Sequence, residues 1–345
     1  MNDKTCSFCK DQSNSLPAER VPPLVSVIVP VYKVEDVLVR CLDSLCRQSL
    51  REIEIVLIDD ASPDRCSEIC EQYSTKDTRF KVIHQLENRG LSVARNTGIA
   101  HASSDYLMFV DSDDWVHEDF CKVAYECAVK HETDIVVFGY ERIGFPNTSF
   151  KRQSVVSNIP KGMKTGVEAI HFLLKGNGSA TWTTWNKLYR KELFKKVSYP
   201  PGYLYEDIGT TYKLVWHASN VYYLDKVLYY HCYHEGSITT LKTEKALHDK
   251  IEMCMQQYRD LERWGYSAEE LDIFIKNVAL TYCIQKKPDA DDSNYAFCRK
   301  VLKSSKQIPE GFTWKRKVLF VLLKYCPPLF ELVCELWGKR WSWFV

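Results

Sequence analysis

The sequence predicts an α/β fold, in which a mostly parallel, Rossmann-like sheet is flanked by helices and followed by an all-helical C-terminal region. Short apolar runs alternate with helical patterns at intervals of about 25–30 residues. These runs are continuously apolar, which indicates strands buried on both faces, as in parallel sheets. Beyond residue 244 only helical patterns follow. The chain has 345 residues, 45% hydrophobic and 26% charged, which suits two structural units of ordinary globular composition.

Strands and helices are predicted to alternate up to residue 138. The predicted strands are Leu24–Val29, which Pro30 stops, then Ile53–Ile58, Phe80–His84, Tyr106–Val110 and Asp134–Phe138. The predicted helices are Glu35–Gln48, Ser67–Ser74, Leu91–Ala102 and His117–His131. Parallel strands joined by right-handed crossovers bring their carboxyl ends to one edge, where such sheets bind ligands. The polar residues that follow the strands should therefore share one crevice: Tyr32, Asp59, Asp60, Asn88, Asp111, Ser112 and Asp113.

The remaining chain shows less regular patterns before it becomes helical. Residues 140–165 lack a period and predict a loop or a strand excursion. Helices are predicted over Val167–Leu174, Glu206–His217, 244–264, 269–286 and 291–305, strands over Val221–Tyr233, and two tail helices separated by Pro327-Pro328. The predicted divisions are a flexible leader 1–23, an α/β domain 24–240 with halves 24–115 and 116–240, a helical region 241–311 and a basic amphipathic tail 312–345.

Charge and composition exclude several classes of function. A net charge of +1 gives no global basic field, so no nucleic-acid partner is expected. The polar N-terminus lacks the apolar segment of a secretory signal, which predicts a cytoplasmic protein with reduced thiols. Cys6 and Cys9 form a lone pair, and a structural zinc site needs four ligands, so a flexible leader is favoured over a metal or redox role. No apolar stretch reaches the ~18 residues of a spanning helix.

The most informative segment ends the fourth predicted strand with Asp111, Ser112, Asp113 and Asp114. In an extended chain, the carboxylates of Asp111 and Asp113 point to the same side and repel each other. A divalent cation would relieve this repulsion, and ligation by oxygen alone suits Mg²⁺ or Mn²⁺. Because such ions usually keep phosphate oxygens as further ligands, a phosphate-bearing substrate is expected. The alternative is a solvated acidic turn that caps the following helix.

Four segments in a fixed order carry a resemblance to a known family. They are Val25–Tyr32 (VSVIVPVY), Ile58–Ser62 (IDDAS), Glu87–Gly98 (ENRGLSVARNTG) and Phe109–Asp114 (FVDSDD). In order and spacing they closely resemble glycosyltransferase family 2 of the bacterial polysaccharide type, an inverting family with the GT-A fold. The resemblance spans residues 24–235 and extends to Trp185–Arg190, Tyr205–Ile208 and Tyr229–Ile238.

The resemblance implies a nucleotide-sugar donor, with UDP favoured, at the carboxyl edge of the sheet. Pro30 ends its strand and places Tyr32 beside the crevice, where the ring can lie against a nucleobase. Asp60 is expected to accept a hydrogen bond from an imide N–H of the base, as the second Asp of this pair does in relatives. The other implied donor contacts are Asn88, Arg95, Asp111, Ser112 and His234, whereas Asn96 is expected to hold the fold. A surface cation is the alternative for Arg95.

The same resemblance implies the metal ligands and the base. Asp113 is the metal ligand, and Asp111 assists the Mg²⁺ or Mn²⁺ or contacts the ribose. Asp114 is expected to cap the following helix. Asp207 is the expected catalytic base that takes the proton of the acceptor hydroxyl, with Glu206 in support. The alternative is that these two acids only stabilise a helix N-terminus.

The expected activity is metal-assisted transfer of a sugar, with inversion, to a hydroxyl of a cell-surface polysaccharide or lipid-linked oligosaccharide. A second hypothesis is a non-catalytic nucleotide-sugar-binding scaffold subunit, against which the intact Glu206-Asp207 pair argues. A third is a nucleotidyltransferase, but its Gly-rich, cationic phosphate loop is missing after the first strand, where Pro30, Val31 and Tyr32 stand.

The tail differs in composition from the rest of the chain. Residues 312–345 contain six Lys or Arg against two Asp or Glu, whereas the other residues carry a small net negative charge. Basic residues beside aromatic and amphipathic segments favour a peripheral position on a membrane surface, here the inner face of the plasma membrane. Packing of the tail helices on the enzyme body is the alternative.

Overall fold

A computed structural model describes most of the chain. The described residues are 22–144, 153–155, 161–175, 182–233, 243–286, 292–305, 307–309 and 312–338. The Cys6–Cys9 pair, nearly all of the predicted leader and His234 therefore lie outside the described residues.

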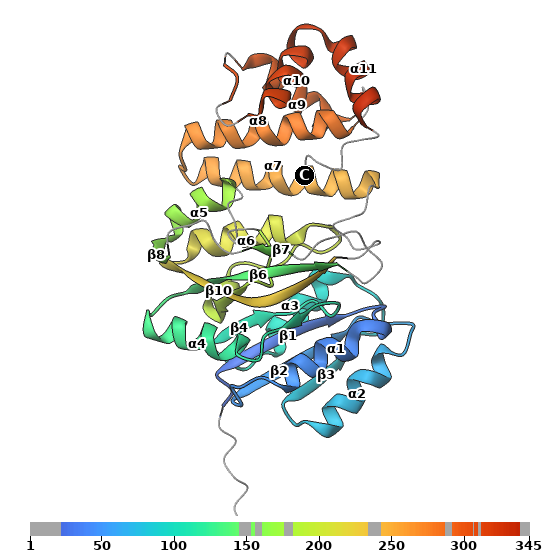
Figure 1. Ribbon diagram of the computed structural model, residues 1–345, viewed down its shortest axis with the longest axis vertical. Helices are drawn as coiled ribbons and strands as arrows, with labels where there is room; N and C mark the ends of the chain where they lie inside the picture. Colours follow the sequence, from blue (N-terminus) through green and yellow to red (C-terminus); the bar gives the residue numbers. More distant parts are fainter. Residues whose placement is uncertain are drawn as a thin grey trace, which may run out of the picture.

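One mixed sheet forms the base of the molecule (Figure 1). Its strands are β1 (Val25–Val31), β2 (Ile53–Asp59), β3 (Phe80–His84), β4 (Tyr106–Phe109), β5 (Trp115–Val116), β6 (Ile135–Gly144), β7 (Gln153–Val155), β8 (Gly162–Thr165), β9 (Lys187–Arg190) and β10 (Asn220–Tyr233). The helices are α1 (Glu35–Cys46), α2 (Cys66–Lys76), α3 (Leu91–His101), α4 (Phe120–Lys130), α5 (Gly166–Lys175), the 3₁₀ helix η1 (Lys191–Lys195), α6 (Glu206–His217), α7 (Glu244–Arg263), α8 (Ala268–Gln285), α9 (Ser293–Ser304), α10 (Trp314–Tyr325) and α11 (Pro327–Gly338).

The strand order is β3-β2-β1-β4-β9-β6-β10-β5, with β7 beside β6 and β8 beside β10. Strands β1 to β4 are mutually parallel where they pair, and β6 is parallel to β10. Strand β9 runs antiparallel between β4 and β6 and joins the two parallel groups. The predicted α/β class with C-terminal helices is confirmed, and the predicted bounds of β3 and α6 agree with those observed.

The expectation that Pro30 stops the first strand is wrong. Strand β1 continues to Val31, and Pro30 stands opposite Ile58 of β2 in register. The neighbour on the other side, β4, pairs only with Ser26 to Ile28. Because Pro30 lies beyond that neighbour, its missing N–H is not needed in that ladder.

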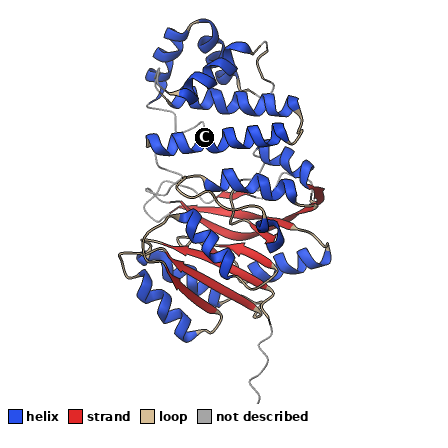
Figure 2. Ribbon diagram, turned by 180° about the vertical axis from the view of Figure 1, so that it is seen from behind, coloured by secondary structure: helices blue, strands red, loops and turns tan. Residues whose placement is uncertain are grey.

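Helices flank the sheet on both faces (Figure 2), and apolar side chains are buried on each face. Val25, Val27 and Val29 of β1 pack in one core with residues of α1, α2 and α4. On the other face Ile28 lies in a second core with Leu107, residues of α5 and α6, and others. This arrangement explains the continuously apolar strands, because successive side chains alternate between the two faces.

The C-terminal helices stack beyond α6, at the end of the molecule away from α1 and α2 (Figure 1). The Tyr212 hydroxyl of α6 donates to Asp260 of α7 at 2.6 Å, which ties the helical region to the α/β domain. Helices α10 and α11 contribute Leu319, Phe320, Leu323 and Phe330 to a separate core with α8 and α9. The alternative that the tail packs on the body therefore holds for one face of these helices. Among the described residues, no helix has the length and hydropathy needed to cross a bilayer.

Candidate active site

An acidic turn follows β4 at the carboxyl edge of the sheet. The Asp114 N–H donates to the carbonyl of Asp111 at 3.0 Å, which closes the turn. Ser112 and Asp114 are buried, whereas Asp111 and Asp113 keep part of their surface exposed. The turn therefore presents two of its three carboxylates toward solvent, in the i and i+2 relation that the sequence predicted.

The expectation that Asp114 caps the next helix is wrong. Its carboxylate accepts hydrogen bonds from the Tyr229 hydroxyl at 2.7 Å and from the Cys232 N–H at 2.6 Å. The N-cap position of α4 is occupied by Asp119, five residues later. Asp114 thus fixes β10 against the acidic turn, and burial, together with the charges of Asp113 and Asp111, raises its pKa well above the usual value.

Arg95 of α3 connects the acidic turn to a second acidic motif. Its guanidinium donates to Asp111 at 2.8 Å and also to Glu206, a residue 111 positions later in the sequence. The side chains of Arg95 and Glu206 are only 3% and 5% exposed. The structure therefore places Arg95 inside the protein as a bridge between two carboxylates, rather than on the surface of its helix.

The second motif is the start of α6. Tyr205 precedes it in the left-handed conformation, with φ of 59°, which turns the chain sharply into the helix. Glu206 points inward to Arg95, and Asp207 accepts from the N–H of Ile208 at 2.8 Å. Burial and the neighbouring Glu206 charge raise the pKa of Asp207 to about 7, against the smaller opposing effect of Arg95. A carboxyl group in this range can exchange protons near neutral pH.

The acids that end β2 hold loops in this structure. Asp60 accepts from the N–H groups of Arg89 and Gly90 at 2.9 and 2.8 Å. Asp59 accepts from the Ser62 N–H at 3.0 Å and contacts a His84 ring nitrogen at 2.8 Å. Asp60 therefore shapes the segment that follows β3, on which the predicted donor residue Asn88 lies.

Tyr32, Asn88 and Asn96 differ in their surroundings. Tyr32 follows β1 and its side chain is 39% exposed, and Asn88 is exposed as well. Asn96 exchanges hydrogen bonds with the backbone of Tyr199, which agrees with the fold-holding role expected for it. The exposed pair remains open to a ligand, whereas Asn96 fixes the segment that leads to α6.

Sequence reasoning missed two groups that shape the site. The Tyr229 hydroxyl contacts both the Asp111 N–H and the Asp114 carboxylate, yet the sequence offered only a matching aromatic motif there. Lys187 of β9 is buried and donates to the Thr183 carbonyl and the Asn186 side chain, each at 2.6 Å. Burial lowers the pKa of Lys187 to about 7, although Asp207 acts in the opposite direction. No pattern in the sequence indicated that this lysine would be buried.

Trp185 packs in the interior of the protein. It is buried and stacks with Tyr229 and with His231, with ring centroids 4.4 and 5.3 Å away. Trp185 is therefore part of the core. Within the described part of the chain, no three His, Cys, Asp or Glu side chains gather as a metal site.

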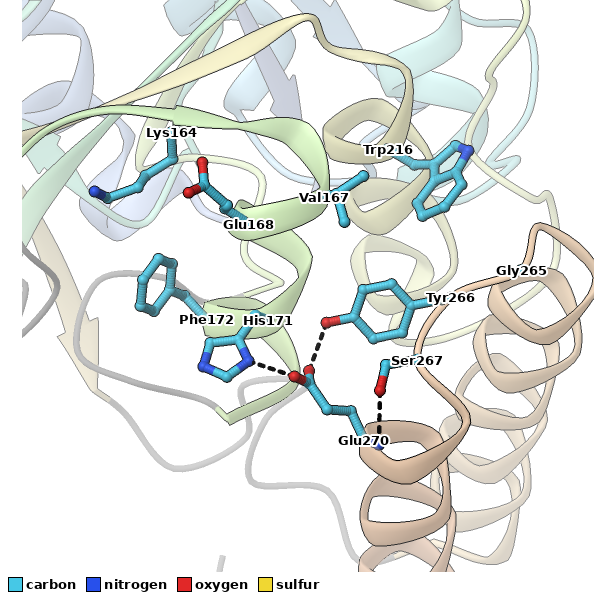
Figure 3. Close-up of a pocket in the computed structure, with 10 residues that line it drawn as sticks. All are labelled: Lys164, Val167, Glu168, His171, Phe172, Trp216, Gly265, Tyr266, Ser267 and Glu270. Atoms are coloured by element: carbon cyan, nitrogen blue, oxygen red, sulfur yellow. Dashed lines mark hydrogen bonds and ion pairs between the residues drawn. The ribbon is translucent and has the colours of Figure 1, made fainter.

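A separate hollow of about 490 Å³ lies between α5, the end of α6 and the start of α8 (Figure 3). The Glu270 carboxylate accepts a hydrogen bond from the Tyr266 hydroxyl at 2.5 Å and contacts a His171 ring nitrogen at 2.8 Å. These contacts join the helical region to α5. None of the predicted site residues lines this hollow, so it is distinct from the acidic crevice.

Comparison with known proteins identifies a family and several relatives. Residues 26–198 match the family described as Glycosyl transferase family 2. The glycosyltransferase GlyA of Streptococcus pneumoniae is 34% identical over 71% of this chain, which spans only 36% of GlyA. EpsJ of Bacillus subtilis, described as an uncharacterized glycosyltransferase, is 34% identical over 73% of this chain and 75% of its own length.

Two solved structures share the fold. Residues 1–349 of TarS from S. aureus, in complex with UDP-GlcNAc, give a TM-score of 0.55 at 22% identity and cover 92% of this chain and 91% of theirs. The mannosyltransferase PcManGT of Pyrobaculum calidifontis, in complex with GDP-Man and Mn²⁺, gives a TM-score of 0.53 at 15% identity. The match covers 93% of this chain and 89% of PcManGT. The resemblance inferred from the four motifs is confirmed: this chain belongs to glycosyl transferase family 2.

Proposed function

We propose that this protein transfers a sugar from a UDP-sugar to a hydroxyl of a cell-surface polysaccharide or lipid-linked oligosaccharide, with inversion at the anomeric carbon. The observation that carries the proposal is the meeting of two acidic motifs at one edge of the sheet, joined by Arg95. The donor class is supported by TarS, which was solved with UDP-GlcNAc and with UDP. The acceptor class is supported by relatives such as the poly(ribitol-phosphate) beta-glucosyltransferase of Bacillus spizizenii.

Asp207 serves as the base. The acceptor oxygen forms a bond to the anomeric carbon while the bond from that carbon to the nucleoside diphosphate breaks, and the hydroxyl proton passes to the Asp207 carboxylate. An ordinary aspartate is a weak base, so the raised pKa of Asp207 improves the match to the task. Glu206 supports this role by holding Arg95, which fixes the start of α6 relative to the acidic turn.

Asp113 and Asp111 would hold a divalent cation, Mg²⁺ or Mn²⁺. Both carboxylates are partly exposed, and their oxygens are ligands that these ions prefer. One oxygen of Asp111 already accepts from Arg95, so Asp113 would be the principal protein ligand. The ion would offset the charge that develops on the departing diphosphate. PcManGT, which shares the fold, was solved with GDP-Man and Mn²⁺.

The nucleoside lies against the ends of β1 and β2. Pro30, Tyr32 and Ser112 are the proposed contacts there, and the exposed Tyr32 ring offers a stacking surface for the base. Asp60 shapes the Asn88 segment through two backbone hydrogen bonds and reaches the base only if it exchanges them. The enzyme works in the cytoplasm at the inner face of the plasma membrane, where lipid-linked acceptors are accessible.

Thermal unfolding with different nucleotide-sugars tests the proposal. Purified protein is heated with UDP-, GDP-, dTDP- or CMP-sugars, each with Mn²⁺ and with EDTA. A donor at about 100 times its Kd adds about 2.7 kcal/mol to stability, so a UDP-sugar should raise the Tm only with the metal. Asp113→Ala should remove the shift, whereas Asp105→Asn, an exposed acid before β4, should keep it. A Tm increase with another nucleotide-sugar but not with a UDP-sugar contradicts the donor assignment. A protein that binds the donor but neither transfers nor hydrolyses its sugar favours the scaffold alternative.

A further inference from the structure

The two C-terminal helices expose an apolar stripe in addition to their buried face. On α10 the exposed residues are Trp314, Val318, Val321 and Tyr325, at the i, i+4, i+7 and i+11 positions that share one helix face. On α11 Leu329, Leu332 and Leu336 stand at i, i+3 and i+7, which also share one helix face, and are 43%, 51% and 68% exposed. We call these seven residues the terminal stripe.

The terminal stripe is not needed for the core. Helix α10 already buries Leu319, Phe320 and Leu323 on its other face, and α11 buries Phe330. Seven of the sixteen large exposed hydrophobic residues of the described chain fall within this one segment. Isolated exposed hydrophobic residues are ordinary, but such a concentration marks an interaction surface.

Charge indicates what covers the terminal stripe. Lys317 is exposed one helical turn from Val321, whereas the Lys324 ammonium donates to the Ser305 carbonyl at 2.6 Å. Trp314 and Tyr325 stand at the two ends of α10, and such amphipathic rings favour the boundary between water and lipid. Residues 312–338 carry four Lys or Arg against two Glu, and the sequence beyond them adds Lys339 and Arg340.

We propose that the terminal stripe lies in the surface of an anionic lipid bilayer, with α10 and α11 parallel to the membrane. Apolar side chains would enter the boundary between headgroups and acyl chains while Lys317 contacts lipid phosphates. A second copy of the chain fits less well, because a symmetric contact through the stripe would bring like charges together. The inference rests on the stripe and its charges and stands independently of the sugar donor.

The position of the stripe has a functional corollary. Helices α10 and α11 form the end of the molecule that lies opposite α1 and α2 (Figure 1), so neither the sheet nor its helices cover them. The intervening helices α7 to α9 then act as a spacer between the membrane and the acidic crevice. This placement suits an acceptor whose lipid end stays in the bilayer while its saccharide end reaches the enzyme.

Vesicle sedimentation of the full chain tests the inference. The protein should sediment with vesicles of phosphatidylcholine and phosphatidylglycerol and much less with phosphatidylcholine alone. Val318→Asp with Val321→Asp should weaken binding at least about ten-fold, because charges on the lipid-facing side oppose insertion. Lys317→Gln should weaken it about five-fold, as expected for one cation at an anionic surface. Val129→Asp, at an equally exposed valine of α4, should bind like the unchanged protein.

Several results would overturn the inference. They are no sedimentation of the unchanged protein, equal losses in the Val129→Asp control, or a dimer in solution that Val318→Asp with Val321→Asp separates into monomers. Lys317→Gln keeps the test decisive if the double variant fails to fold, since it changes one exposed side chain. A Tm shift with nucleotide-sugars, measured without vesicles, separates failure of this inference from failure of the proposed activity.

Discussion

The acidic turn after β4 and the start of α6 each place two carboxylates next to each other, but they treat them differently. In the turn, Asp114 is enclosed with neutral partners, the Tyr229 hydroxyl and the Cys232 N–H. In α6, the enclosed Glu206 has a cationic partner, Arg95. The other acid of each adjacent pair, Asp113 or Asp207, is partly exposed. The comparison shows that the contacts of each acid, and not its position in the motif, decide its role. An enclosed acid with partners stabilises the fold, whereas a partly exposed acid is available to a ligand.

The largest expected effect comes from removing the carboxylate of Asp207, the proposed base at the start of α6. Asp207→Asn keeps the shape of the side chain but cannot accept the acceptor's proton. Loss of a general base typically costs about 10²–10⁴-fold in rate, so kcat should fall by that factor. Donor binding, followed by the Tm shift with a UDP-sugar, should remain. Normal turnover in Asp207→Asn would show that the two motifs do not differ in the way described.

The pH dependence sharpens the same prediction. Since the base must be ionised and its pKa is raised to about 7, kcat/KM of the unchanged protein should rise between pH 6 and pH 8. Asp105→Asn, at an exposed acid, should retain this profile. A kcat/KM that does not change between pH 6 and pH 8 would contradict Asp207 as the group that accepts the proton.

The next effect concerns Arg95, the cation that joins the two motifs. Arg95→Met leaves Asp111 and Glu206 without their shared partner, and breaking a buried ion pair costs about 3–5 kcal/mol. The free energy of unfolding, measured by urea denaturation, should fall by this amount. Arg65→Met is a matched control, because Arg65 pairs with Glu68 on the surface and such pairs contribute about 0–1 kcal/mol. Equal losses in the two variants would contradict a buried bridge.

The smallest expected effect is a change in how stability varies with pH. A carboxyl whose pKa is higher in the folded than in the unfolded protein stabilises the fold fully at low pH, and that contribution is lost as pH rises through the folded pKa. For Asp207 this loss falls between about pH 4 and pH 7. Asp207→Asn should therefore gain about 2–3 kcal/mol over the unchanged protein on going from pH 5 to pH 8. Urea denaturation at both values checks this, and a larger gain at pH 5 would reverse the assignment.

Local sequence patterns predicted the elements whose packing is local. The bounds of β3 and α6 agree with prediction, because their apolar spacing and acidic start depend on nearby residues. Strand β9 was not predicted as a strand, since its place between β4 and β6 depends on partners 80 and 50 residues away in the sequence. Pro30 was read as a stop because the short reach of β4 cannot be seen in the sequence.

The site shows the same division. The motifs named Asp111, Arg95 and Glu206, and the structure joins the two acids through Arg95, a link that the sequence did not predict. The roles of Arg95 and Asp114 escaped because each is defined by a contact with a residue more than a hundred positions away. A motif shows which residue types are close in the sequence. Which of their side chains are buried, and against what, depends on tertiary packing.

The place of β9 in the sheet also bears on how the chain is made. Residues 25–109 emerge from the ribosome first, yet the outer edge of β4 acquires its neighbour only when residues 187–190 follow. At about 5–20 residues per second, the intervening stretch takes several seconds to synthesise. An uncovered strand edge can pair with other chains during that time. Crowding of nascent chains is therefore most hazardous to this protein in the interval before β9 appears.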